Sequence, residues 1–68
     1  MDAIKLTITN HLINKTITMF VSQDSARNIM RDKTANLHNT VCKEGTTNVM
    51  RSHDKNGYLM LTIRTSKA

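Results

Sequence analysis

Alternating apolar and polar residues near the start of the chain predict two β-strands. Residues 3–9 place Ile4, Leu6 and Ile8 on one side and polar residues on the other, which is the period of a half-buried strand. Residues 16–21 alternate in the same way, and the segment between the two runs carries Asn10 and Asn14, which suit turn conformations. The pattern therefore predicts an antiparallel hairpin.

A helix is predicted after this hairpin, because the period of the apolar residues lengthens beyond Ser22. The Ser22 hydroxyl is suited to cap the first turn, and Asp24 places a favourable negative charge near the positive helix end. The apolar residues that fall near one face are Ala26, Ile29, Met30 and Leu37. We expect the helix to end near Leu37.

Residues 39–46 are expected to form a loop. Gly45 is the residue in it that suits a special backbone conformation, and Val41 is expected to lie under the sheet. A second hairpin is predicted over residues 48–65, because Asn56 and Gly57 between two strand-like runs are the strongest short-range hairpin signal.

The register of this hairpin decides which of its side chains are exposed. A two-residue loop at Asn56-Gly57 buries Met50 and Ser52. Four side chains then share the outer face: Arg51, His53, Tyr58 and Arg64. Met60 is exposed beside them. A bulged three-residue loop would instead turn Arg51 and His53 inward, at a cost in desolvation. We therefore favour the two-residue loop.

These elements predict one α+β domain over residues 1–68, in which an antiparallel sheet of about four strands packs on one helix in the order β-β-α-β-β. Phe20 and Tyr58 are the aromatic residues, so the core is expected to be aliphatic and rich in methionine. A chain of 68 residues buries a modest core, and homodimerisation would bury more apolar area. Cys42 is the single cysteine, and no signal peptide or membrane-spanning run is evident, so we expect a cytoplasmic protein.

Ten Lys and Arg against five Asp and Glu give a net charge of +5, which attracts phosphates or an acidic protein surface, or simply keeps the protein soluble. No set of nucleophile, base and orienting group is evident, so we expect no enzyme activity and no cofactor. His38 and Cys42 could form half of a zinc site completed by His53 or Asp54, but the paired spacing of zinc ligands is missing and we expect no metal.

Six residues are the candidates for binding a protein or nucleic acid: Arg27, Arg31 and Lys33 on the helix, and Arg51, Tyr58 and Arg64 on the second hairpin. Arg27 and Arg31 are four residues apart and share a helix face. The alternative is that the helix residues form an ordinary solvated face.

Two stretches resemble a small family of type I-F anti-CRISPR proteins, the ninth in the usual numbering. One is Val49-Met50-Arg51 followed after four residues by Asn56-Gly57 and an apolar strand, and the other is the helix start Ser25-Ala26-Arg27-Asn28-Ile29. The resemblance implies a short antiparallel sheet around one helix, and a phage-encoded inhibitor that docks on a CRISPR surveillance complex and obstructs pairing of guide RNA with target DNA. It also implies a contact role for Arg27, and for Arg31 and Lys33 by proximity.

Two functions are thus expected from different classes. The first is a non-catalytic inhibitor of a host nucleic-acid-handling complex, of phage or mobile-element type. The second is a free-standing DNA- or RNA-binding regulator, dimeric or not, that places the same basic residues on phosphates.

Overall fold

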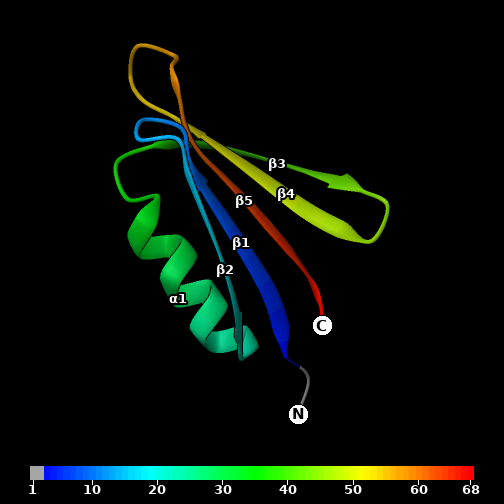
Figure 1. The fold of residues 1–68 in the computed structure, drawn as a ribbon. Helices are drawn as coiled ribbons and strands as arrows, with labels where there is room; N and C mark the ends of the chain where they lie inside the picture. Colours follow the sequence, from blue (N-terminus) through cyan, green and yellow to red (C-terminus); the bar gives the residue numbers. More distant parts are fainter. Residues whose placement is uncertain (1–2) are drawn as a thin grey trace.

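The chain folds into a five-stranded antiparallel sheet with one helix on one of its faces (Figure 1). The computed structural model describes residues 3–68. In chain order the elements are β1 (Ile4–Asn10), β2 (Lys15–Val21), α1 (Gln23–Lys33), β3 (His38–Glu44), β4 (Thr47–His53) and β5 (Leu59–Lys67). The α+β class is confirmed, but the sheet has five strands in the order β2-β1-β5-β4-β3 and the chain order is β-β-α-β-β-β, so the expected four-strand arrangement is wrong.

The first hairpin, β1 with β2, is confirmed. Leu6 pairs with Met19 and Ile8 with Ile17, so the apolar sides of both strands lie on the same face. Asn14 takes a φ of 54°, a left-handed conformation that asparagine tolerates. The last strand, β5, then pairs with β1 and becomes the central strand of the sheet.

The helix begins as the sequence indicates and ends earlier than expected. The Ser25 backbone N–H donates to the Ser22 hydroxyl at 3.2 Å, which is the predicted cap. At the other end Thr34 is the C-cap, and its N–H and its hydroxyl both donate to the Met30 carbonyl, at 3.0 and 2.7 Å. Asn36 then takes a φ of 67°, a left-handed conformation that cannot continue the helix. The expected end near Leu37 is wrong, although Leu37 still packs, half-buried, against the core.

The segment expected as a loop is mostly the edge strand β3. Its seven residues pair with β4 from His38 opposite His53 to Glu44 opposite Thr47. All seven are exposed, and Val41 is 69% exposed, so the expectation that Val41 lies under the sheet is wrong. The prediction for Gly45 is confirmed, because it opens the two-residue β3–β4 loop with a φ of 64°.

The tip of the β4–β5 hairpin is a bulged three-residue loop, so the expected two-residue loop is wrong. The Gly57 N–H donates to the Asp54 carbonyl, and the Asp54 N–H donates to the Tyr58 carbonyl, both at 3.0 Å. The Asp54 carboxylate holds this loop by accepting from the N–H groups of Asn56 and Tyr58, both at 2.9 Å. Gly57 takes the left-handed φ of 87° that such a bulge requires.

A second irregularity restores the register below this loop. His53 pairs with Leu59, but the next pair is Ser52 with Leu61, so Met60 has no partner on β4. The two shifts compensate, and Arg51 pairs with Thr62 as a two-residue loop would also have required. Arg51 is therefore not turned inward by the bulge.

The core lies between α1 and the face of the sheet that the helix covers. It is aliphatic, as expected, and its buried members are Leu6, Ile8, Met50, Leu61 and Ile63. The helix contributes the buried Ala26 and the partly buried Ile29 and Met30. In Figure 1 the helix runs beside β1 and β2, while the β3–β4 hairpin extends away from it. The described part of the chain contains no helix long and apolar enough to cross a membrane.

Candidate binding surfaces

A basic groove runs along the helix side of the molecule. One flank of α1 supplies Gln23 and Arg27, and the facing wall comes from the ends of β3, β4 and β5. The wider part holds about 620 Å³, and a narrower part of about 270 Å³ lies against the helix. The two parts share Ile4, Gln23, Asn48 and Thr65, so they form one continuous groove, called here the helix-side groove.

Three cations and no anion line this groove. Arg27 stands on the helix, Lys43 on β3 and Lys67 on β5, and the described lining residues include no Asp or Glu. Most of the other lining side chains are polar: Gln23, Thr46, Asn48, Thr65 and Ser66. Ammonium and guanidinium groups among hydroxyl and amide groups suit phosphate or carboxylate oxygens. The groove can therefore accept an acidic ligand with no carboxylate side chain among its described lining residues.

Arg31 continues the row from Arg27 along the outside of α1, whereas Lys33 does not. Both arginines are exposed, and Arg31 donates to the Asn28 side-chain oxygen at 3.1 Å. Its contact with Asp32 is 4.0 Å between two side chains more than 70% exposed, and such a pair neutralises little charge. Lys33 follows Arg31 by two residues, so it is turned about 160° around the helix. The structure thus brings Arg27 and Arg31 together and separates Lys33 from them.

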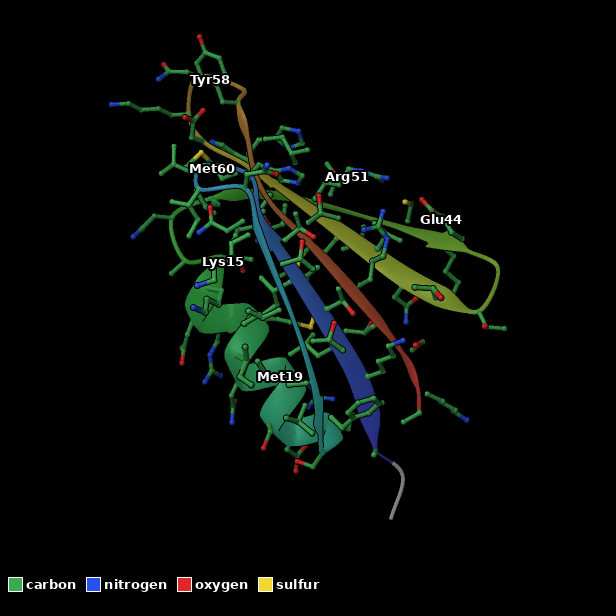
Figure 2. All side chains as sticks on the ribbon, in the orientation of Figure 1. Lys15, Met19, Glu44, Arg51, Tyr58 and Met60 are labelled. Carbon is green, nitrogen blue, oxygen red and sulfur yellow. The ribbon has the colours of Figure 1, made fainter. Side chains whose placement is uncertain are left out.

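The helix-free face of the sheet carries a second basic group, Arg51 and Arg64. Arg51 pairs with Thr62, and Arg64 is two residues farther along β5 on the same face. Figure 2 shows Arg51 and Glu44 on the neighbouring strands β4 and β3; the guanidinium lies 3.3 Å from the Glu44 carboxylate and donates to the Cys42 sulfur, also at 3.3 Å. The hydrogen bond to Cys42, and then the one to Glu44, raise the pKa of Arg51 above its ordinary value. Arg51 is therefore charged at any working pH, but its charge is partly neutralised by Glu44.

The rest of the helix-free face is rich in threonine. Hydroxyl groups pair across β1 and β2, at 3.3 Å between Thr7 and Thr18 and at 3.1 Å between Thr9 and Thr16. The exposed Lys5 and Phe20 lie opposite each other on the same face. Sequence analysis missed Lys5 and Phe20 here, although the strand alternation places both on the polar side of the first hairpin.

Tyr58 belongs to neither basic surface. It lies at the tip of the β4–β5 hairpin, 69% exposed, and Figure 2 shows it well apart from Arg51. Arg64 is six residues farther along the chain, about 20 Å away at the rise of a strand. Met60, expected to be exposed beside Tyr58, is instead half-buried and packs against the core. The expected cluster of Arg51, Tyr58 and Arg64 is therefore not formed, although the two arginines do share a face.

The six predicted binding residues thus occupy separate parts of the surface. Arg27 lines the helix-side groove, and Arg31 lies one helical turn farther along α1. Lys33 ends the helix, Arg51 and Arg64 lie on the other face of the sheet, and Tyr58 lies at a hairpin tip. Sequence analysis missed Lys43 and Lys67 as candidates. No local pattern indicates them, because they line the same groove as Arg27 only when β5 pairs beside β1 and β3 forms a strand.

Among the described residues, no group of three or more His, Cys, Asp and Glu side chains is placed to hold a metal ion. Comparison of the chain with protein-family models, curated protein sequences and solved structures finds no match. Function is therefore inferred from the geometry and charge of the surfaces described above.

Proposed function

We propose that this protein is a non-catalytic binding protein of phage or mobile-element type that inhibits a host nucleic-acid-handling complex in the host cytoplasm. Docking uses the helix-side groove together with Arg31. The observation that carries the proposal is the lining of that groove, which has three cations and no carboxylate among its described residues. The proposal follows the function that the resemblance to type I-F anti-CRISPR proteins implies.

The groove indicates the chemistry of the partner. A net charge of +5 on 7.7 kDa attracts anionic surfaces over distances of about the Debye length, ~8 Å in physiological salt. The cations belong to three separate elements, α1, β3 and β5, so an extended acidic ligand could meet all of them at once. Such a ligand is an acidic segment of a protein subunit of that complex.

A free-standing DNA- or RNA-binding regulator is the second candidate. It is favoured by the helix-free face, where Lys5, Arg51 and Arg64 accompany the exposed Phe20, a side chain on which a base could stack. This function requires direct binding to nucleic acid. The logarithm of the association constant should fall with the logarithm of the salt concentration, with a slope of about 0.9 for each duplex phosphate that the protein neutralises. No detectable binding to DNA or RNA at low salt would refute it.

An affinity pull-down from a bacterial lysate, with and without nuclease, separates the two functions. The inhibitor function predicts a protein partner that remains bound after nuclease treatment. A partner lost on nuclease treatment would favour the regulator and contradict docking on protein subunits. The variant Arg27→Glu/Arg31→Glu serves as the matched bait with the basic row reversed, and both residues are exposed, so the fold is expected to be kept.

A further inference from the structure

We infer that the free edge of β3 pairs with the β3 edge of a second copy of this chain, giving a homodimer with a continuous ten-stranded sheet. This inference rests on the backbone of one sheet edge and not on the charge of the basic groove, although Lys43 belongs to both. β3 is the last strand on its side of the sheet, and the helix lies toward the other side (Figure 1). All seven of its residues, His38–Glu44, are exposed.

The β3 edge lacks most of the features that protect edge strands from pairing. Natural edges are usually short, bulged, or carry proline or several charges. β3 keeps an uninterrupted seven-residue register with β4, contains no proline, and has Lys43 as its one lysine. Its central residue, Val41, is a β-branched side chain that is 69% exposed on the side of the sheet that carries the core. Such an edge is a template for another strand.

The edge is complementary to itself when the two-fold axis passes through Val41. A two-residue loop is closed by the Glu44–Thr47 pair, so alternation along an antiparallel ladder directs the backbone groups of Asn39, Val41 and Lys43 to the free edge. Centring on Val41 places these residues opposite one another. It also uses the full length of the strand and sets Glu44 opposite His38 of the partner and Asn39 opposite Lys43 of the partner. A two-fold contact of this kind is closed and cannot extend into a fibre.

The single chain exposes more surface than a folded monomer of its mass is expected to expose, and a dimer interface would cover such an excess. The accessible area is 4904 Å², whereas a folded monomer of 7.7 kDa is expected to expose about 4,300 Å². The chain is elongated, with extents of 39 × 22 × 20 Å. An excess of about 600 Å² per chain matches small specific interfaces, which bury about 1,200 Å² in total. We therefore expect a concentration-dependent dimer and not an obligate one.

Sedimentation equilibrium over a concentration series tests the pairing. The wild-type chain is expected to approach twice the 7.7 kDa chain mass at high concentration. Val41→Lys places two like charges directly opposite each other and is expected to weaken association by up to about fivefold. Leu12→Lys, at a loop residue 74% exposed, is the matched control and is expected to leave association unchanged.

Mixing separates loss of pairing from loss of folding. Val41→Lys and Val41→Glu should each be monomeric, whereas an equimolar mixture should recover the dimer, because opposite charges then face each other. A monomer at every wild-type concentration, or a mixture that stays monomeric, would overturn the inference.

Disulfide trapping tests the register. Thr40 lies opposite Cys42 of the partner in the Val41-centred register, as a closely spaced pair whose Cα atoms are about 4.5 Å apart, within reach of a disulfide. Thr40→Cys is therefore expected to form covalent dimers under mild oxidation, and Thr40→Cys/Cys42→Ser is expected to form none. Covalent dimers that are as abundant in the Cys42→Ser background would contradict the register.

Discussion

Replacing Ser52 with alanine is expected to stabilise the protein. Ser52 is fully buried on β4, and its hydroxyl oxygen has no hydrogen-bond partner among the described residues. An unsatisfied buried polar group costs about 1–3 kcal/mol, and part of that gain is offset by the small void that alanine leaves. We therefore expect a net gain of about 1 kcal/mol, which in a domain of this size raises the melting temperature by about 4–8 °C.

Thr62→Val is the matched control, because it removes a buried hydroxyl that does have a partner. Thr62 is 5% exposed on the adjacent strand β5, and its hydroxyl lies 2.8 Å from the His11 ring nitrogen. Loss of that hydrogen bond is expected to lower stability by about 1 kcal/mol. The two substitutions should therefore have opposite signs.

Thermal and urea unfolding followed by circular dichroism measure both variants. Equal m-values for the three proteins would show that the changes reflect stability and not the compactness of the unfolded chain. A melting temperature for Ser52→Ala several degrees below that of the wild type would refute the reasoning, because the hydroxyl would then make a stabilising bond.

Three further substitutions test the fold. Leu6→Ala removes a fully buried core side chain at a cost of about 3–5 kcal/mol. The total stability of a domain of this size is about 3–10 kcal/mol, so urea titration should show a largely unfolded or barely stable protein. A urea midpoint near that of the wild type would contradict the assignment of Leu6 to the core. Gly57→Ala meets no atom within 4 Å but requires a φ of 87°, so urea unfolding should show a loss of about 1–2 kcal/mol from strain alone; no loss would contradict the bulged loop. Ser22→Ala removes the helix cap and is expected to lower stability by about 1 kcal/mol. Amide hydrogen exchange should then accelerate in the first turn of α1 and not in β5. Unchanged exchange in the first turn of α1 would contradict the role of Ser22 as the cap.

Local patterns identified those elements that have one covered face. β1 and β2 alternate because their two faces meet core and solvent, and the Ser22 cap is a property of neighbouring residues. β3 has no covered face, so its sequence carries no alternation, and only its pairing with β4 makes it a strand. The helix ends early because Asn36 takes a left-handed φ of 67° two residues after the Thr34 cap, and apolar periodicity does not report such a backbone change.

The register of the second hairpin was predicted correctly below the loop, but the reason given for it was wrong. The Asp54 carboxylate stabilises a three-residue loop, and the unpaired Met60 then compensates for the shift. The two register shifts thus cancel and leave Arg51 and Arg64 on one face of the sheet. Tyr58 is displaced from them because it closes the loop opposite Asp54 and precedes the first residue of β5, Leu59.

The candidate site was predictable only in part. The spacing of Arg27 and Arg31 placed them on one helix flank, and Arg27 lines the groove. Lys43 and Lys67 join them through contacts between strands that are distant along the chain, and no local pattern reports such contacts.

The most direct test of the proposed function compares partner binding by two double charge reversals on opposite sides of the sheet. Arg27→Glu/Arg31→Glu reverses the flank of the helix-side groove, and Lys5→Glu/Arg64→Glu reverses two exposed cations of the helix-free face, with an equal change in net charge. The account predicts that the first variant loses the nuclease-resistant partner in the pull-down while the second retains it, and that both keep the wild-type circular dichroism spectrum. Full retention of the partner by a folded Arg27→Glu/Arg31→Glu variant would contradict the account.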